Sequence, residues 1–576
     1  MAAYILNTWK KTAAMVALVC LAACSQGDVS APPQGGEAAA ALQAHSAQFR
    51  QEVVQVLPGI HVAIGYGLAN TILIEGRDGL IIVDAMESAE AAEAVKSAFA
   101  RISTQPVKAL IYTHFHSDHI GGGRILAGND RPEVYCHAET LAHMNRTATV
   151  TRETTYRRAM RQFGTLLPEG GRINAGIGPR LLYDETKTLA LLPPTRTFEG
   201  ERLDLEIAGV KLVLMRAPGE TPDQIVVWLP EQRVLLPADN FYHSFPNLYA
   251  IRGTAYRDVM LWVKSLDRMR ALQAEYLIPQ HTRPIVGEQK IYTTLTDYRD
   301  AIQFVHDQTI RWMNRGLTPE AIVERVRLPE HLAAQPYLQE YYGTVAWSVQ
   351  AIFDGYLGWF GGNATDLFPL GQQVRAERFA TLAGGQTALL DHARKALADG
   401  DYQWSLELTD QLLLLDPSAP DVRQIKADAL RALGHRQTAA TARNYYLTQA
   451  LEVEEKLTIG SLKISDPQLI HTVPLAAIFE GMAVKLDPEK SAGLDVVAGF
   501  RFPDTGEAYT VHVRRGVAEI RPEFPEHPAI AISIDSNVWK EIAAGARNPA
   551  VALVTEMDKE GGTLDIVRFL SLFKAD

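Results

Sequence analysis

The sequence predicts an α/β domain, followed by an all-helical domain and a smaller α+β domain at the C-terminus. Three observations indicate this order. Short apolar runs separated by glycine turns, a helical stretch and a further buried strand follow residue 53, which is the pattern of an α/β sheet. Helical spacing of apolar residues then dominates from 292 to 357 and from 388 to 455. Strand-like segments return at 508–513 and 517–520.

Length and composition set outer limits. At 576 residues the chain is too long for one hydrophobic core, so three or more domains are expected. The 47% hydrophobic and 21% charged residues are those of a folded globular protein. A formal net charge of −11 argues against a nucleic-acid-binding protein, which normally shows a basic surface. It does not exclude an anionic small substrate, because local arginines and metal ions decide the field inside a cleft.

The N-terminus resembles an export signal. Lys10 and Lys11 precede the apolar stretch 12–23, which is shorter than the roughly 20 residues of a membrane-spanning helix. It ends in Leu-Ala-Ala-Cys24, which resembles the bacterial lipoprotein cleavage box with Cys24 as the lipidated residue. An ordinary signal peptide cut nearby is the alternative. We expect a signal peptide over 1–24 and a periplasmic or outer-membrane-anchored product.

A flexible tether is expected over 25–45, because this stretch is rich in Ala, Gly, Pro and Ser. The α/β domain then extends over 46–375 and ends in a helical extension. Its predicted elements, in chain order, are strands at 60–64, 70–74 and 80–83, a helix at 88–101, strands at 107–112, 203–207, 210–216, 225–229 and 234–236, and a helix at 254–272. Beyond Cys24 the only cysteine is Cys136, so no disulfide within the chain is expected.

The helical domain is expected over 376–456, with breaks at 400–401, 416–417 and 434–435. It is loosely similar to a tetratricopeptide helix pair. One or two such units make no solenoid, so packing or dimerisation is the better role. The remaining residues, 457–576, form the α+β domain.

Four side chains that can bind metal lie within six residues, directly after the strand predicted at 107–112: His114, His116, Asp118 and His119. Imidazole nitrogens and carboxylate oxygens suit Zn²⁺. His114 and His116 can bind one ion while Asp118 and His119 face a second. Two such ions can share a hydroxide and make it a nucleophile at neutral pH. A solvated histidine-rich loop is the alternative, but the ordered spacing after a strand argues against it.

Together with Thr113 before it and Ile-Gly-Gly after it, this run resembles the signature of the metallo-β-lactamase superfamily. The resemblance implies an αββα sandwich that binds two Zn²⁺ ions per chain. It also implies three further ligands, each after a strand, namely Glu220, Asp239 and His281. The implied sets are His114, His116 and Glu220 around one ion, and Asp118, His119 and His281 around the other, with Asp239 between them. Asp223 is the alternative to Glu220.

The superfamily usually has His in a Pro-Gly-His turn where this chain has Glu220, and that change resembles the alkylsulfatase branch. The segments 239–253 and 342–363 resemble that family's region after the bridging carboxylate and the start of its helical dimerisation region. The resemblance to the dimerisation region implies a homodimer. The last domain resembles the sterol-carrier-like domain of the same family. One departure is Asp239, where the family carries Glu; it leaves metal binding intact but weakens the substrate assignment.

The resemblance also implies that Asn247 and Arg252 hold a sulfate. A guanidinium offers a planar fork to a tetrahedral oxyanion, and an amide adds a neutral donor. The alternative for Arg252 is a surface ion pair. Asp118 and His243 are the expected catalytic residues, with His243 donating a proton to the leaving group or, alternatively, making a structural hydrogen bond. The arginines at 152, 157, 158 and 161 line the entrance or form a solvated helix face.

The expected function is therefore a zinc hydrolase that cleaves alkyl sulfate esters to an alcohol and sulfate through a metal-bridging hydroxide. Two alternatives stay open. One is another hydrolase on the same metal core that acts on phosphoesters, lactones or β-lactams. The other is a lipoprotein that binds hydrophobic ligands and carries an inactive metal site. All seven implied ligand positions hold competent residues, which argues against an inactive site.

Overall fold

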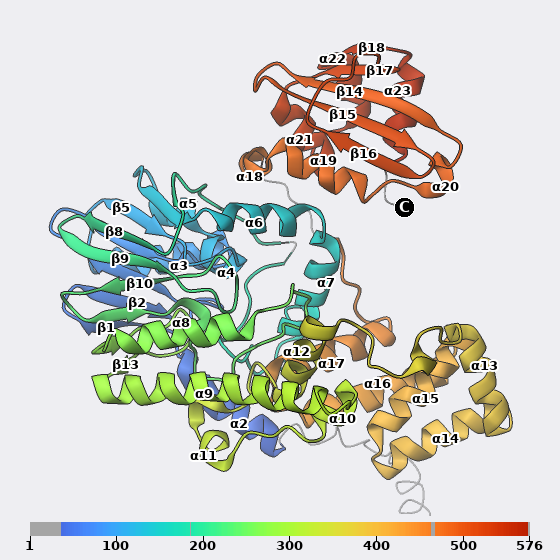
Figure 1. Ribbon diagram of the computed structural model, residues 1–576, viewed down its shortest axis with the longest axis horizontal. Helices are drawn as coiled ribbons and strands as arrows, with labels where there is room; N and C mark the ends of the chain where they lie inside the picture. Colours follow the sequence, from blue (N-terminus) through green and yellow to red (C-terminus); the bar gives the residue numbers. More distant parts are fainter. Residues whose placement is uncertain (1–35, 185, 462–466, 574–576) are drawn as a thin grey trace, which may run out of the picture.

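A computed structural model describes residues 36–184, 186–461 and 467–573. The signal peptide, the lipidation site Cys24 and most of the expected tether lie outside the described residues. The order of an α/β sandwich, a helical region and an α+β domain is the one predicted from the sequence (Figure 1). No helix in the described part of the chain is long and apolar enough to cross a membrane.

The first sheet has seven strands whose spatial order follows the chain. They are β1 (Glu52–Leu57), β2 (Ile60–Ile64), β3 (Thr71–Glu75), β4 (Leu80–Val83), β5 (Val107–Ile111), β6 (Glu133–His137) and β7 (Arg196–Phe198). The first four pair antiparallel, and β4 to β7 run parallel. The carboxyl ends of the parallel strands therefore meet at one edge, where a loop after β5 can meet loops after its neighbours.

The second sheet has six strands in the order β13-β12-β11-β10-β9-β8. Their bounds are β8 (Arg202–Ile207), β9 (Val210–Arg216), β10 (Ile225–Leu229), β11 (Val234–Leu236), β12 (Tyr276–Leu277) and β13 (Ile285–Val286). Buried Ile, Val and Leu side chains from both sheets form one core between them. Most of these strands are apolar on both faces, because helices cover their outer sides.

Helices complete the αββα sandwich. α3 (Ala89–Phe99) and α5 (Gly123–Ala127) pack on the outer face of the first sheet, α8 (Val259–Ala271) and α9 (Glu288–Met313) pack on the second, and α12 (Val345–Leu357) packs on α9. The starts of α3 and α8 are capped by Ser88 and Asp258, which accept hydrogen bonds from backbone N–H groups of the first turn. Short helices fill the connections: α4 (Ser117–Ile120), α10 (Pro319–Val323), α11 (Glu330–Ala333), η1 (Ser46–Phe49), η2 (Ala238–Asn240), η3 (Pro336–Leu338) and η4 (Ala364–Asp366).

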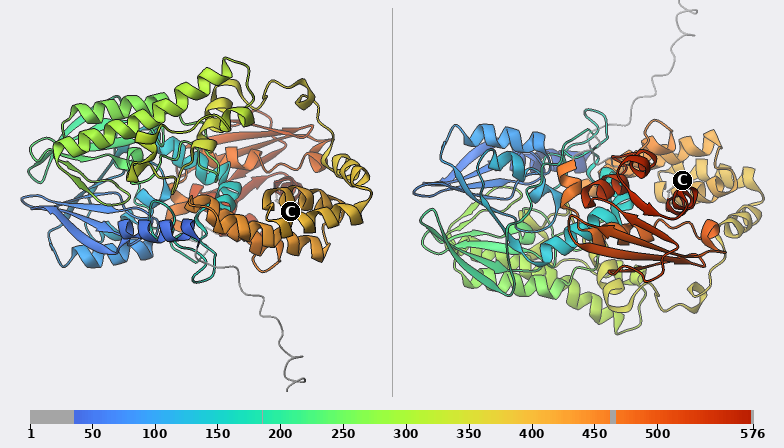
Figure 2. Two further views of the ribbon diagram at one scale, coloured as in Figure 1. Left: turned by 90° about the horizontal axis from the view of Figure 1, so that it is seen from below. Right: turned by 90° about the horizontal axis from the view of Figure 1, so that it is seen from above.

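An insertion between β6 and β7 carries two helices: α6 (Glu139–Thr149), which the sequence analysis did not predict, and α7 (Arg152–Phe163), which it considered only as a solvated helix face. α6 contacts the C-terminal domain through α19, and α7 packs on α17 of the helical region. The insertion thus joins the sandwich to both other domains (Figures 1 and 2).

The helical region consists of α13 (Gln372–Ala383), α14 (Gln386–Asp399), α15 (Tyr402–Leu415), α16 (Pro420–His435) and α17 (Ala440–Val453). The predicted break at 400–401 is a left-handed glycine, since Gly400 has φ +81° and Asp401 caps the next helix.

The C-terminal domain has a sheet in the order β16-β15-β14-β17-β18, with helices packed on a buried aromatic core. The two predicted strands are present as an antiparallel pair, β15 and β16. The elements are α18 (Pro467–Thr472), α19 (Leu475–Ala483), α20 (Pro488–Ser491), β14 (Asp495–Phe502), β15 (Glu507–Arg514), β16 (Val517–Arg521), β17 (Ile530–Ser533), α21 (Ser536–Ala544), α22 (Pro549–Thr555), β18 (Asp558–Glu560) and α23 (Thr563–Ser571).

The tether prediction is wrong for its last residues, because Glu37–His45 form helix α2. Leu42 and His45 are buried, and the Asn174 side chain donates to the Leu42 carbonyl at 2.8 Å. The run Glu-Ala-Ala-Ala-Ala-Leu has high helix propensity. The alanines of this segment therefore indicate a helix rather than a flexible linker.

Candidate metal centre and cavity

The seven predicted ligands come together, although they lie on four separate segments of the chain. His114 and His116 follow β5, Asp118 and His119 lie in α4, and the other three follow β9, β11 and β12. They form three buried groups of candidate ligands: His114, His119 and Asp239; Asp118, His119 and His281; and His116, Glu220 and Asp239. In each group the ligand atoms lie within 4.8 Å of one another.

Asp239 occupies the middle of the cluster. Its Oδ2 lies 3.2 Å from His281 Nε2 and 3.7 Å from His114 Nε2, and its Oδ1 lies 3.5 Å from His119 Nε2. Burial opposes ionisation of Asp239, but the imidazoles of His281 and His119 outweigh it and hold its pKa well below the ordinary value. The carboxylate is therefore placed to face both ligand sets.

The donor atoms fit a pair of metal ions. His119 Nε2 and Asp239 Oδ1 are fully buried, and neither has a hydrogen-bond partner among the described residues. Buried polar atoms are normally satisfied, so two orphaned atoms in one cluster indicate a missing ligand. Burial lowers the pKa of His114 to about 3, which keeps its imidazole in the neutral form that binds metal. Nitrogen and carboxylate donors together suit Zn²⁺.

Asp84 holds two of the histidines, and the sequence analysis missed it. Its Oδ2 lies 2.8 Å from His119 Nδ1 and accepts from Thr113 Oγ1 at 2.9 Å. Thr113 Oγ1 in turn lies 3.0 Å from His114 Nδ1. With Nδ1 engaged in this way, Nε2 of each ring is turned toward the centre. The available signal was an acidic residue directly after β4, the parallel neighbour of β5.

The loop between β2 and β3 holds His281. His281 Nδ1 donates to the Leu68 carbonyl at 2.9 Å. The Asn70 amide donates to the carbonyls of Pro279 and Thr282 at 3.0 and 2.7 Å. Buried Glu87 accepts from Leu68 N at 3.0 Å and so fixes that loop. The sequence analysis predicted the strands on either side but not this support.

Glu220 lies beside a buried cation. Its Oε1 is 3.1 Å from Arg257 Nη2, and both side chains are only 2% exposed. Tyr242 Oη donates to Glu220 Oε2 at 3.3 Å. Burial raises the pKa of Glu220, and Arg257 opposes that shift. Asp223, the alternative ligand, is also buried but joins none of the ligand groups found among the described residues. Arg257 was missed because nothing in its local sequence pairs it with a loop 37 residues earlier.

Arg252 reaches the cluster, with Nη2 2.9 Å from His116 Nε2. The structure does not place it in the surface ion pair considered above. Asn247 is buried, and its Nδ2 has no hydrogen-bond partner among the described residues, but it does not line the cavity. His243 does not line it either. Its Nδ1 lies 2.9 Å from Thr282 Oγ1, so it makes the structural hydrogen bond that was the alternative.

Three of the four arginines around α7 bond to other parts of the fold, and only Arg152 lines the cavity. Arg152 pairs with Glu153 at 3.0 Å. Arg158 donates to the Ile251 carbonyl, Arg161 pairs with Glu452, and Arg157 donates to Ser461 Oγ at 3.4 Å. Neither a solvated face nor an arginine-lined entrance describes this helix.

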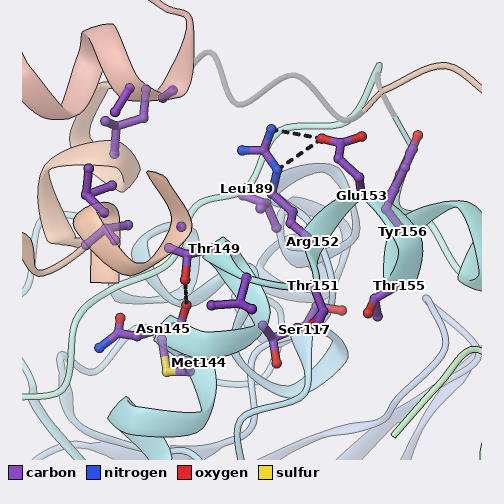
Figure 3. A pocket seen from close by; sticks show the side chains of 18 of the residues that line it. Ser117, Met144, Asn145, Thr149, Thr151, Arg152, Glu153, Thr155, Tyr156 and Leu189 are labelled. Atoms are coloured by element: carbon purple, nitrogen blue, oxygen red, sulfur yellow. Dashed lines mark hydrogen bonds and ion pairs between the residues drawn. The ribbon is translucent and has the colours of Figure 1, made fainter. Parts of the chain in front are cut away.

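A cavity of about 1260 Å³ opens from the cluster. His116, Asp118, Glu220, Asp239 and Arg252 line its floor. Its sides come from α6 and α7, and Figure 3 shows Thr149, Thr151 and Thr155 there together with the Arg152–Glu153 pair. The far wall belongs to the C-terminal domain, with apolar residues that include Ile478, Met482, Val484, Trp539, Val567 and Phe573. A polar floor below apolar walls suits a molecule with an anionic head and an apolar tail.

Comparisons with known proteins agree with this arrangement. Residues 64–281 match the metallo-β-lactamase superfamily, 318–456 match the alkyl sulfatase dimerisation family and 463–575 match the alkyl sulfatase C-terminal family. The dimerisation match begins inside the helical extension that the sequence analysis assigned to the α/β domain.

Relatives cover nearly the whole chain. A linear primary-alkylsulfatase of Pseudomonas sp. is 37% identical over 87% of this chain and 98% of its own length. An alkyl/aryl-sulfatase of Saccharomyces cerevisiae is 30% identical over 90% of this chain and 82% of its own. The structure of a stereoselective inverting sec-alkylsulfatase from Pseudomonas sp. superposes with a TM-score of 0.87 at 26% identity, and covers 96% of this chain and 88% of that one.

Proposed function

Because the chain belongs to the alkylsulfatase family of the metallo-β-lactamase superfamily, we propose that it is a binuclear zinc hydrolase that cleaves alkyl sulfate esters to an alcohol and inorganic sulfate. The observation that carries the proposal is the cavity, since four residues of the metal cluster and Arg252 line its floor while its far wall is apolar. One zinc would be held by His114, His116 and Glu220, the other by Asp118, His119 and His281, with Asp239 between them. When bound, such a pair lowers the pKa of water and supplies a nucleophile at neutral pH.

The chain's own groups bind and orient the ester. Arg252 lies at the cluster with its guanidinium beside His116, where it can hold sulfate oxygens and stabilise negative charge that develops on them. Asn247 Nδ2 is a buried donor without a described partner, but Asn247 does not line the cavity and is given no contact with the sulfate. Its buried backbone carbonyl accepts a hydrogen bond from Arg257. We give His243 no part in proton transfer, because its ring is bonded to Thr282 outside the cavity.

The test of this function is sulfate release from dodecyl sulfate by purified protein, with added zinc and with a chelator. We expect release that depends on zinc and a content of two zinc ions per chain. Zinc-loaded protein that releases no sulfate from any alkyl sulfate but hydrolyses a phosphoester, lactone or β-lactam would overturn the substrate class. Full metal content without hydrolysis of any ester would favour a binding protein instead.

The apolar wall is expected to select for long alkyl chains. Val484 and Val567 line the cavity from the C-terminal domain and are 60% and 46% exposed, so replacing both with Asn spares the domain core. Each lost contact with an alkyl tail is worth about 1 kcal/mol, or about fivefold in KM. We expect a higher KM for dodecyl sulfate and little change for butyl sulfate. Val517 and Val554, exposed on the same domain but outside the cavity, provide the matched control.

We also propose that the chain forms a homodimer through its helical region. Large apolar side chains are exposed along 356–382, among them Trp359 at 73%, Phe368 at 94% and Leu382 at 87%. This segment lies within the match to the dimerisation family. Exposed apolar area of this kind is typical of an interface; sedimentation as a monomer at micromolar concentration would contradict it. Export and lipidation at Cys24 stay predictions, because that segment lies outside the described residues.

A further inference from the structure

Two side chains of α7 hold the peptide group that joins Ile251 to Arg252. Arg158 Nε and Nη2 both donate to the Ile251 carbonyl, at 3.0 and 2.7 Å. Gln162 Oε1 accepts from Arg252 N at 2.8 Å. Positions 158 and 162 are one helical turn apart and therefore share a face of α7. Arg158 thus fixes the carbonyl of this peptide group, and Gln162 fixes its N–H.

We propose that Arg158 and Gln162 are positioning residues that hold Arg252 in place for the sulfate group of the substrate. The inference rests on the proposed role of Arg252. This arginine lies in the connection between η2 and α8, where no helix or strand orders residues 241–258. Gly253 follows with φ +103°, a conformation that glycine adopts at no steric cost. A turn bond from Gly253 N to the Ala250 carbonyl, at 2.9 Å, shapes the local backbone, and the clamp fixes this turn relative to α7.

The helix that carries the clamp is itself well supported. Gln162 and Met160 are fully buried. Arg161 makes two parallel bonds to Glu452 of α17, at 2.7 and 2.8 Å. α7 ends at Gly164, which has φ +58° as a left-handed cap. The position of Arg252 is therefore set from the helical region, through α17 and α7, as well as from the sandwich.

A displaced Arg252 would weaken sulfate binding without removing the charge, because binding and catalysis depend steeply on where such a group is held. The clamp bonds and the guanidinium are separate groups, so each can be altered alone. Gln162 is uncharged, and any effect of its replacement on sulfate binding cannot come from a lost charge. That property makes it the sharper of the two positions to test.

The experiment compares Gln162→Met and Arg158→Met with wild type. Arg157→Met is the matched control, since Arg157 is on the same helix but reaches Ser461 rather than the 251–252 peptide group. KM and kcat for an alkyl sulfate, the inhibition constant of inorganic sulfate, zinc content and Tm are measured for each, with Arg252→Lys as reference. We expect KM and the sulfate inhibition constant to rise about tenfold in both Met variants at unchanged zinc content. Arg157→Met should stay near wild type.

Each of the other outcomes overturns a specific part of the proposal. If Arg252→Lys weakens sulfate inhibition but both Met variants match wild type, the clamp is not needed and the inference is wrong while the proposed function stands. If Arg252→Lys leaves sulfate inhibition unchanged, the proposed role of Arg252 fails first. If Gln162→Met loses zinc together with Tm, Gln162 supports the fold rather than the position of Arg252.

Discussion

Replacing Asp239 with Asn is expected to lower the zinc content from two ions to at most one and to reduce sulfate release on the order of a thousandfold or more. Asp239 alone belongs to the ligand groups of both His114 and His116, and its two oxygens face His119 and His281. The amide keeps the shape but loses the negative charge and one acceptor oxygen. Zinc analysis by mass spectrometry and sulfate release by ion chromatography measure the two effects independently.

Asp223→Asn is the matched control for this prediction. Asp223 is also buried and follows β9, and the Asp223→Asn change removes the same charge as Asp239→Asn. Because it joins no ligand group among the described residues, we expect two zinc ions and near wild-type release. Zinc loss from Asp223→Asn with retention in Asp239→Asn would reverse the assignment of the ligands.

The metal cluster was predictable because its ligands obey a local rule. Each follows a strand of apolar residues, and strands of one sandwich deliver their loops to one edge. The run from His114 to His119 fixed the first position, and the resemblance to the superfamily's Pro-Gly-His turn put Glu220 before Asp223 in order of preference. The structure places Glu220 in the cluster, as that order indicated.

Residues that act through long-range pairing could not be found in this way. Arg257 stands in an irregular segment, and only the folded chain brings it to Glu220. His243 lies near Asp239 in sequence, yet the loop turns its ring toward Thr282, which shows that sequence proximity is weak evidence for a shared site. Helix α6 escaped prediction, and α7 was considered only as a solvated helix face, although both line the cavity and α7 carries the clamp on Arg252.

The pairing of Glu220 with Arg257 also explains how this chain tolerates a carboxylate at a position where the superfamily resemblance implies a neutral histidine. A buried carboxylate is costly unless it is paired, and Arg257, itself 4% exposed, is the nearby cation. Arg257 additionally donates to the Asn247 carbonyl. The stabilities conferred by Glu220 and Arg257 are therefore expected to depend on each other, because removal of either side chain leaves the charge of the other buried and unpaired.

Glu220→His is expected to destabilise the zinc-free protein by about 3–5 kcal/mol, even though histidine is a competent zinc ligand, because Arg257 then remains buried without its anion. Adding Arg257→Met should recover most of this loss, leaving about 1 kcal/mol for the donor that the Asn247 carbonyl loses. Urea unfolding of the zinc-free variants measures the stabilities without the contribution of metal binding. The double variant should also regain zinc that the single variant loses, because the unpaired guanidinium repels a cation at that position. Equal stability of Glu220→His and wild type would show that Arg257 does not depend on Glu220, and that the carboxylate is held for metal binding alone.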